Sequence, residues 1–272
     1  MFDKENKLGL VLEGGGVKGA YQVGALTAIK EIGVEFDGVV GTSIGAINGA
    51  LYLEGGYAKL LEVWKEIKTN TVYALSDEEI ESLHNLEFTP AILKVVREKK
   101  LKTVRMLEES YKQSQDFFQK LVHEDVIRAS GKDFGVVAFD VTDFQPFEMM
   151  MDGIENGKLV DYIIASATFP IFPPKSVNEK KYVDGGVYDN MPINLLARSG
   201  YDKMLVIRTN TMDRPPKRKI ERGDIDMFFI APERDLGPAM AFSERRVHDF
   251  LQCGYDDAKR LMQSGLKEFL LS

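Results

Sequence analysis

The residues best suited to chemistry in this chain are Gly41-Thr42-Ser43-Ile44-Gly45, a G-x-S-x-G pattern. They follow the apolar pair Val39-Val40 and precede a helical pattern of small and apolar residues. A serine between a strand and a helix in this pattern is typical of a nucleophile elbow, where a strained turn exposes the hydroxyl. Glycines on both sides let the strand and the helix pass closely, and the helix N-terminus favours developing negative charge. An ordinary glycine-rich turn is the alternative interpretation.

A second glycine-rich segment, Gly14-Gly15-Gly16-Val17-Lys18-Gly19, lies between a strand pattern at 8–13 and a helical pattern at 20–32. A dinucleotide fingerprint would require an acidic residue at the end of the second strand, where the sequence leads into the serine motif instead. A phosphate-binding P-loop would require Lys and then Ser or Thr after the last glycine, where Ala20-Tyr21 stand. Because adjacent strand-helix units share one sheet edge, backbone N–H groups of this loop are expected to form an oxyanion hole beside the serine.

The serine needs a general base to remove its proton. Of the three histidines, His84 and His123 fall in a charged helical region where surface positions are expected. Ser43, Asp184 and His248 follow the chain order of an α/β-hydrolase triad, but His248 falls within a helical pattern rather than on a loop. The alternative is a Ser43–Asp184 dyad, in which an apolar environment would raise the pKa of the aspartate toward neutral pH.

The aspartate belongs to Lys180-Lys181-Tyr182-Val183-Asp184-Gly185-Gly186, a short strand pattern followed by two glycines. Gly185 and Gly186 would let the backbone approach closely, although a tight turn explains Asp-Gly-Gly when it is considered alone. Asp189 is a weaker candidate for the base, because it follows the glycine turn instead of ending the strand.

Composition excludes several classes of function. In 272 residues, 42 acidic side chains exceed 35 basic ones, and the net charge of −7 argues against nucleic-acid binding. Cys253 is the only cysteine, which excludes an intrachain disulfide and a cysteine-rich metal site. The first residues are polar, and no apolar run approaches the roughly 20 residues of a membrane span. A cytoplasmic location is therefore expected, although secretion without a cleaved signal is compatible with the same sequence.

The remaining pattern is that of a single α/β domain with a helical insert or cap at 57–130. Gly55-Gly56 is expected to end the helix that follows Ser43. Capping signals at Ser76–Glu79 and Thr89-Pro90 mark helices of the insert. Its basic cluster is interpreted as a solvated helix face, with a membrane-docking patch as the alternative; the cluster comprises Arg97, Lys99, Lys100, Lys102 and Arg105. Outside the insert, strands are expected at 134–140, 147–152, 204–208 and 226–230, and helices at 159–166 and from 238 onward.

Four motifs in this order resemble those of the patatin-like phospholipase family across nearly the whole chain. They are the glycine loop, the serine elbow, the segment from Ala165-Ser166-Ala167 to Pro173-Pro174, and Asp184-Gly185-Gly186. The resemblance implies a three-layer α/β/α fold with a mainly parallel sheet, a single domain over 1–272, and catalysis without histidine. The long insert matches no family feature.

Carried over to this sequence, the resemblance implies that Ser43 is the nucleophile, that Asp184 accepts its proton, and that N–H groups around Gly14, Gly15 and Gly16 form the oxyanion hole. Glu13 and Lys18 depart from the usual aspartate and arginine. A lysine keeps the positive charge but loses the planar fork of arginine.

The sequence therefore predicts an acyl hydrolase for lipid esters that contacts membrane surfaces transiently and needs no metal or organic cofactor. Phe169, Ile171, Phe172 and the helices of the insert are expected to line an acyl pocket. Two alternatives stay open: a Ser-Asp-His esterase for soluble esters, and a non-catalytic protein that binds lipid or nucleotide.

Overall fold

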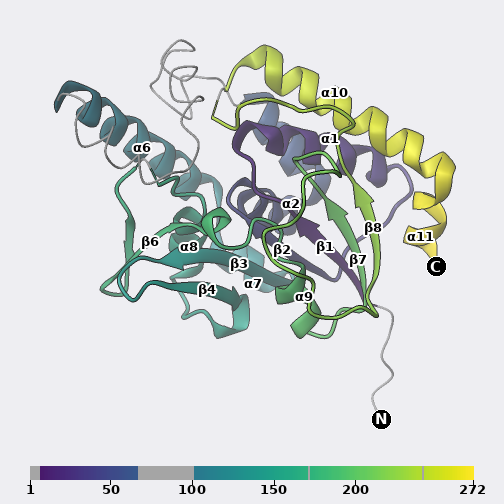
Figure 1. Ribbon diagram of the computed structural model, residues 1–272, viewed down its shortest axis with the longest axis horizontal. Coiled ribbons are helices and arrows are strands. Elements are labelled where there is room, and N and C mark those ends of the chain that lie inside the picture. The colour runs from purple at the N-terminus through teal and green to yellow at the C-terminus, as the bar shows by residue number, and fades with distance from the viewer. Residues whose placement is uncertain (1–6, 67–100, 171, 241) are drawn as a thin grey trace.

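The computed structural model describes residues 7–66, 101–170, 172–240 and 242–272 (Figure 1). The predicted capping signals at 76–79 and 89–90, His84, Ile171 and the basic residues at 97–100 lie outside these ranges. The side chains of Lys102 and Arg105 also lie outside the description.

The described residues form one sheet of eight strands in the order β5-β6-β3-β2-β1-β7-β8, with β4 paired to β3. The strands are β1 (Leu8–Leu12), β2 (Gly38–Thr42), β3 (Asp133–Asp140), β4 (Gln145–Met150), β5 (Lys175–Val177), β6 (Lys180–Asp184), β7 (Lys203–Ile207) and β8 (Asp226–Ile230). Neighbours among β1, β2, β3, β7 and β8 are parallel, whereas β4, β5 and β6 pair antiparallel. The expected mainly parallel α/β sheet is confirmed; β5 is an addition that the sequence pattern did not predict.

Helices cover the sheet on both faces (Figure 1). They are α1 (Gly19–Lys30), α2 (Ile44–Glu66), α6 (Leu101–Leu121), α7 (Glu124–Ala129), α8 (Leu159–Ser166), α9 (Ile193–Arg198), α10 (Glu244–Leu261) and α11 (Lys267–Leu271). Short helical turns follow the glycine motifs at Gly16–Lys18 and Gly185–Val187. The expectation that Gly55-Gly56 ends the helix after Ser43 is confirmed, because both residues leave helical geometry; a second helical segment, included in α2, continues from this kink to Glu66.

Alternating side chains of the strands divide the core between the two faces. Leu10 and Leu12 of β1 join a cluster with α1, α2, α8 and α10, whereas Val11 joins α9 on the opposite face. The expected three-layer arrangement follows from this division. Within the predicted insert at 57–130, the described residues form the second part of α2 together with α6 and α7.

Helices α1 and α10 pack so closely that both require glycine at the contact. Gly24 of α1 faces the carbonyl of Leu251, and Gly254 of α10 faces the carbonyl of Tyr21. The Tyr21 hydroxyl donates to Asp257 Oδ2 at 2.9 Å across the same interface. This contact fixes α10 over the helix that follows the glycine loop.

Candidate active site

The register of β3 brings Ser43 and Asp184 together although 141 positions separate them. Thr42 at the end of β2 pairs with Val137, and Asp184 at the end of β6 pairs with Ala138, the next residue of β3. Strand β4 pairs with the same residues of β3 and occupies its other edge. Strands β2 and β6 therefore share one edge of β3, and their ends meet there.

The turn at Ser43 is strained in the manner that a nucleophile elbow requires. Ser43 has a φ of 56°, which L-residues other than glycine seldom adopt. A Cβ at Gly41 would lie closer than 3.0 Å to the backbone of Gly45, and one at Gly45 would approach the carbonyl of Leu12 as closely. The backbone N–H of Ser43 donates to Ser166 Oγ at 2.8 Å, which helps to hold the turn. The close approach of the neighbouring backbone thus explains why positions 41 and 45 are glycine.

The side chain of Ser43 meets the carboxylate of Asp184 directly. Ser43 Oγ donates to Asp184 Oδ2 at 2.6 Å, and the N–H of Gly186 donates to Asp184 Oδ1 at 2.7 Å. Asp184 is only 7% exposed, and this burial raises its pKa to about 6 against the opposing effects of the Ser43 and Gly186 hydrogen bonds and of the Lys217 charge. Gly185 lies against the carbonyl of Val137, where a side chain would not fit. A carboxylate with this pKa is suited to accept a proton near neutral pH.

The glycine loop approaches the same point but uses some of its N–H groups internally. Gly14 donates to the carbonyl of Asn190 at 2.9 Å, Lys18 donates to that of Gly15 at 3.1 Å, and Gly19 donates to that of Gly16. The N–H groups of Gly15 and Gly16 donate to no acceptor within the described ranges. Within the loop predicted to form an oxyanion hole, the backbone N–H groups of Gly14, Val17, Lys18 and Gly19 are thus already engaged, that of Val17 by the carbonyl of Ala239, which leaves Gly15 and Gly16.

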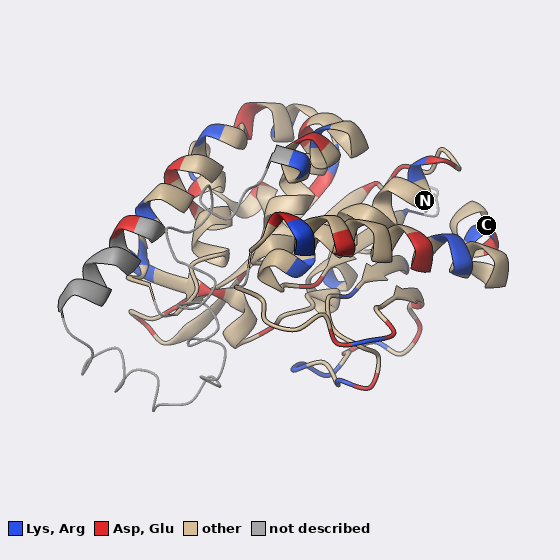
Figure 2. Cartoon of the chain, turned by 90° about the horizontal axis from the view of Figure 1, so that it is seen from above, with Lys and Arg blue, Asp and Glu red and all other residues tan. Residues whose placement is uncertain are grey.

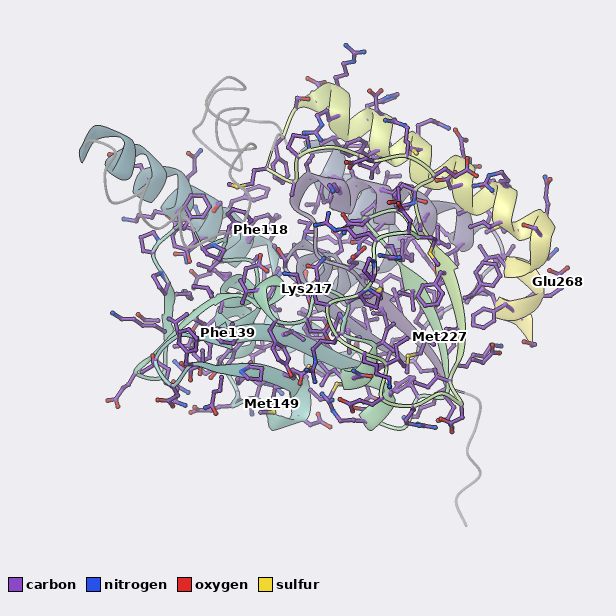
Figure 3. The ribbon with its side chains drawn as sticks, viewed as in Figure 1. Phe118, Phe139, Met149, Lys217, Met227 and Glu268 are labelled. Carbon is purple, nitrogen blue, oxygen red and sulfur yellow. The ribbon has the colours of Figure 1, made fainter. Side chains whose placement is uncertain are left out.

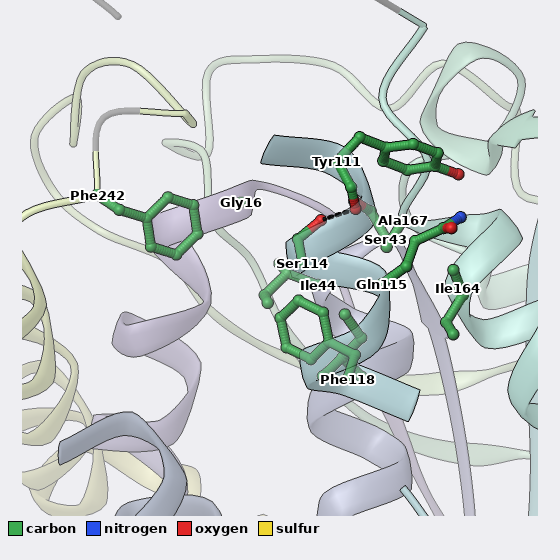
Figure 4. Close-up of a pocket in the computed structure, with 11 residues that line it drawn as sticks. Gly16, Ser43, Ile44, Tyr111, Ser114, Gln115, Phe118, Ile164, Ala167 and Phe242 are labelled. Atoms are coloured by element: carbon green, nitrogen blue, oxygen red, sulfur yellow. Dashed lines mark hydrogen bonds between the residues drawn. The ribbon is translucent and has the colours of Figure 1, made fainter. Parts of the chain in front are cut away.

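A pocket opens beside Ser43 between α2, α6 and α8 (Figure 4). Its lining combines apolar side chains with polar groups from Ser43 and α6; the lining residues are Gly16, Ser43, Ile44, Ile47, Tyr111, Ser114, Gln115, Phe118, Ile164, Ala167 and Phe242. Tyr111 shares a hydrogen bond of 2.6 Å with Thr168 Oγ1 and thereby ties α6 to the end of α8. The expectation that insert helices line this pocket holds for α6, which supplies the rings of Tyr111 and Phe118. Phe169 and Phe172 do not belong to the lining, and Phe172 instead stacks on Tyr111.

Comparison with known proteins shows which family this chain belongs to. The model of the family described as "Patatin-like phospholipase" matches residues 10–197, which include both Ser43 and Asp184. The chain belongs to the patatin-like phospholipase family.

Curated relatives of this patatin-like chain are much longer proteins. The lysophospholipase NTE1 of Cryptococcus neoformans is 27% identical over 208 residues, which are 76% of this chain and 11% of the relative. The neuropathy target esterase sws of Drosophila melanogaster is 27% identical over 216 residues, covering 76% of this chain and 13% of the relative. The chain therefore spans only a small part of the length of the relatives that it matches.

A solved structure supports the patatin-like fold. VipD from Legionella pneumophila aligns over 96% of this chain and 67% of its own, with a TM-score of 0.53 and 16% identity.

In the described part of the patatin-like chain, no helix combines the length and the apolar character needed to cross a bilayer.

Several residues that support the glycine loop had no recognisable signal in the sequence. Asn190 Nδ2 and Thr209 Oγ1 both donate to the carbonyl of Gly14, at 3.0 and 2.6 Å. Glu13 is buried and its Oε2 accepts from the N–H groups of Thr209 and Asn210, at 2.7 and 3.1 Å. Glu13 thus orders the end of β7, which in turn holds the loop beneath Ser43.

The other predicted acid–base residues lie outside the Ser43–Asp184 contact. His123 is exposed and bonds to Glu54, and His248 is exposed on α10. Asp189 is buried, which raises its pKa to about 6, but its Oδ1 accepts from the N–H of Met191 at 3.0 Å rather than from Ser43. Neither of the two described histidines supports the triad interpretation.

Replacing His248 with alanine is expected to leave ester hydrolysis within about twofold of wild type, because an exposed side chain away from such features has little effect. The measurement is kcat/KM for a soluble ester such as 4-nitrophenyl butyrate. Loss of activity by a factor of about 100 or more in a variant with an unchanged melting temperature would instead support the interpretation of Ser43, Asp184 and His248 as a triad.

Proposed function

We propose that this chain is a serine acyl hydrolase that cleaves the carboxylic ester bonds of phospholipids or lysophospholipids through a Ser43–Asp184 dyad. The single observation that carries the proposal is the hydrogen bond of 2.6 Å from Ser43 Oγ to Asp184 Oδ2, formed on a strained elbow. Membership of the patatin-like phospholipase family supports the same conclusion. The relative NTE1 of Cryptococcus neoformans is named a lysophospholipase, and the similarity to it also supports this proposal.

The first half of the reaction transfers the acyl group to the enzyme. Ser43 Oγ attacks the ester carbonyl carbon while Asp184 Oδ2 takes the hydroxyl proton. The N–H groups of Gly15 and Gly16, together with the N-terminus of α2, stabilise the negative charge that develops on the carbonyl oxygen. When the intermediate collapses, the ester C–O bond breaks and the proton on Asp184 passes to the departing alcohol.

The second half releases the fatty acid. Asp184, again ionised, removes a proton from a water molecule that attacks the acyl-enzyme carbonyl. The second intermediate expels Ser43 Oγ, which recovers its proton from Asp184. Apolar side chains of the pocket between α2, α6 and α8 accept the acyl chain, and transient contact with a lipid surface supplies the substrate.

The pH dependence follows from the raised pKa of Asp184. Only the carboxylate form accepts a proton, so kcat/KM for a soluble ester is expected to rise with pH and to level off above an apparent pKa of about 6. A full rate profile between about pH 4 and pH 9 tests this. A limb near pH 4, the ordinary range of an aspartate, would contradict the burial argument.

Two alternatives give different results in the same assays. A Ser-Asp-His esterase requires His248, which is exposed on α10. A non-catalytic lipid- or nucleotide-binding protein would show no turnover, and its ligand binding would be indifferent to Ser43→Ala. Hydrolysis of a fluorogenic lysophospholipid by wild type but not by Ser43→Ala is the result that the proposal expects.

A further inference from the structure

Two cations converge on one neutral oxygen beside the glycine loop. Lys18 Nζ and Arg214 Nη1 each donate to Asn210 Oδ1 at 3.2 Å, so the two donor atoms lie no farther apart than twice that distance. Lys18 is only 6% exposed. Within the described ranges, neither cation has a carboxylate oxygen within 4.0 Å. A pair of like charges that share one amide oxygen lacks the counter-ion that such a site normally contains.

Lys18 is buried among charges of both signs. Burial lowers its pKa, and the charges of Arg214 and Arg246 act in the same direction. Two carboxylates oppose them. Asp235 is exposed, and Glu13 is occupied by the N–H groups of Thr209 and Asn210. An additional anion would therefore be stabilised here.

A third cation borders the dyad itself. Lys217 Nζ donates to the carbonyl of Gly186, in the turn that follows Asp184, and its charge acts to lower the pKa of Asp184. The proximity of Arg214 contributes to a lowered pKa of Lys217. Lys217 and Arg214 lie on the loop between β7 and β8, and Lys217 is found near the middle of the molecule rather than at its rim (Figure 3).

The three cations border Ser43 from the glycine loop and from the β7–β8 loop, and the pocket also reaches Gly16 of the glycine loop. The β7–β8 loop continues from strands on one side of β2, whereas α6 and α8 lie on the other (Figure 1). None of Lys18, Arg214 and Lys217 belongs to the pocket lining. A lipid ester with its carbonyl at Ser43 would then extend its acyl chain toward α6 and its remaining part toward the three cations.

We propose that Lys18, Arg214 and Lys217 form a subsite for the phosphate of a phospholipid head group. The assignment rests on the proposed hydrolysis of lipid esters and extends it to the recognition of the substrate. A phosphodiester has two charged oxygens that accept from a guanidinium and from ammonium groups, and such charge-assisted hydrogen bonds are about twice as strong as neutral ones. Along the long helices, Lys and Arg alternate with Asp and Glu (Figure 2).

The test compares two esters that differ only in the phosphate-bearing group, hexanoyl glycerophosphocholine and hexanoylglycerol. Arg214→Gln and Lys217→Gln are each expected to lower the ratio of kcat/KM for the first to that for the second by about 10-fold or more, the effect of losing one hydrogen bond to a charged group. Lys219→Gln is the matched control, because it removes the same charge from the same loop where the Lys219 carbonyl contacts Asn194. An unchanged ratio in both test variants, or an equal decrease in the control, would overturn the proposal.

Binding without turnover separates the subsite from the reaction. Trp64 is the only tryptophan and stacks on the pocket residue Phe242 at 6.5 Å, so its fluorescence reports ligand binding in Ser43→Ala protein. Adding Arg214→Gln to this background is expected to raise the Kd for hexanoyl glycerophosphocholine about 10-fold. An unchanged Kd would refute the subsite even if wild type is active, and a charge-dependent Kd would support it even if wild type hydrolyses neither ester. Inorganic phosphate that binds as tightly as the phospholipid would refute the head-group assignment.

Discussion

Asp184→Asn is expected to lower kcat/KM for a soluble ester by about 10³-fold or more. An amide accepts the N–H of Gly186 and donates to Ser43 Oγ, so it preserves the two contacts of the carboxylate, but it does not take up the serine proton. Ser43→Ala is expected to cause a similar loss, and the double variant should be no worse than either single one, because the two groups act as a unit. Steady-state kinetics of the three variants measure this. Additive losses would indicate that Asp184 acts independently of Ser43.

Asp184→Asn is also expected to stabilise the fold at alkaline pH. Because folding raises the pKa of Asp184 from 3.8 to about 6, the fold favours the protonated form, and the stability that this group contributes is present below about pH 4 and is lost as the pH rises through 6. A pKa difference of about two units between the folded and unfolded states corresponds to about 3 kcal/mol in the free energy of unfolding. Asp184→Asn should therefore exceed wild type in the free energy of unfolding by up to this amount near pH 8 and match it near pH 4. Urea titrations at both pH values test the difference, and equal destabilisation at both would contradict it.

Gly254→Ala is expected to destabilise the protein by about 3 kcal/mol or more, or to prevent folding. Its Cβ would lie closer than 3.0 Å to the carbonyl of Tyr21, which belongs to the backbone of α1 and is not free to rotate away. The two helices would have to separate along an interface that also contains Gly24, and this cost exceeds the gain of about 1 kcal/mol in helix propensity. The measurement is the free energy of unfolding in urea.

Gly223→Ala is the matched control for this substitution. Gly223 has no atom near the position of its missing Cβ and no positive φ, so the change should be within about 0.5 kcal/mol of wild type. Similar values for the two variants would show that α1 and α10 separate readily and that the glycine contact is not needed.

The features that the sequence predicted correctly are determined by residues that are close together in the chain. A serine turn that must pass against strand and helix needs glycine at positions 41 and 45, and this requirement is visible in five consecutive residues. The alternation of apolar residues likewise gave strands at 134–140 and 226–230 close to the observed β3 and β8. Such features are set by neighbouring residues, and the sequence displays them directly.

The features that were missed depend on contacts between distant segments. Thr209 supports the glycine loop because it follows β7, which lies beside β1 in the sheet, and Asn190 reaches the loop from the segment between β6 and α9; no local pattern indicates either contact. The sequence indicated that insert helices would line the pocket but not which residues, because the lining by α6 depends on the docking of Tyr111 on Thr168; Phe169 and Phe172, which were also expected there, are not part of the lining.

The most direct test of the dyad is labelling with a fluorophosphonate probe followed by identification of the modified peptide. Wild type and His248→Ala should react at Ser43 at similar rates, Ser43→Ala should not react, and Asp184→Asn should react at a rate reduced by about 100-fold or more. Labelling at another residue, or loss of labelling in His248→Ala with Asp184→Asn unaffected, would contradict the assignment of Asp184 as the base.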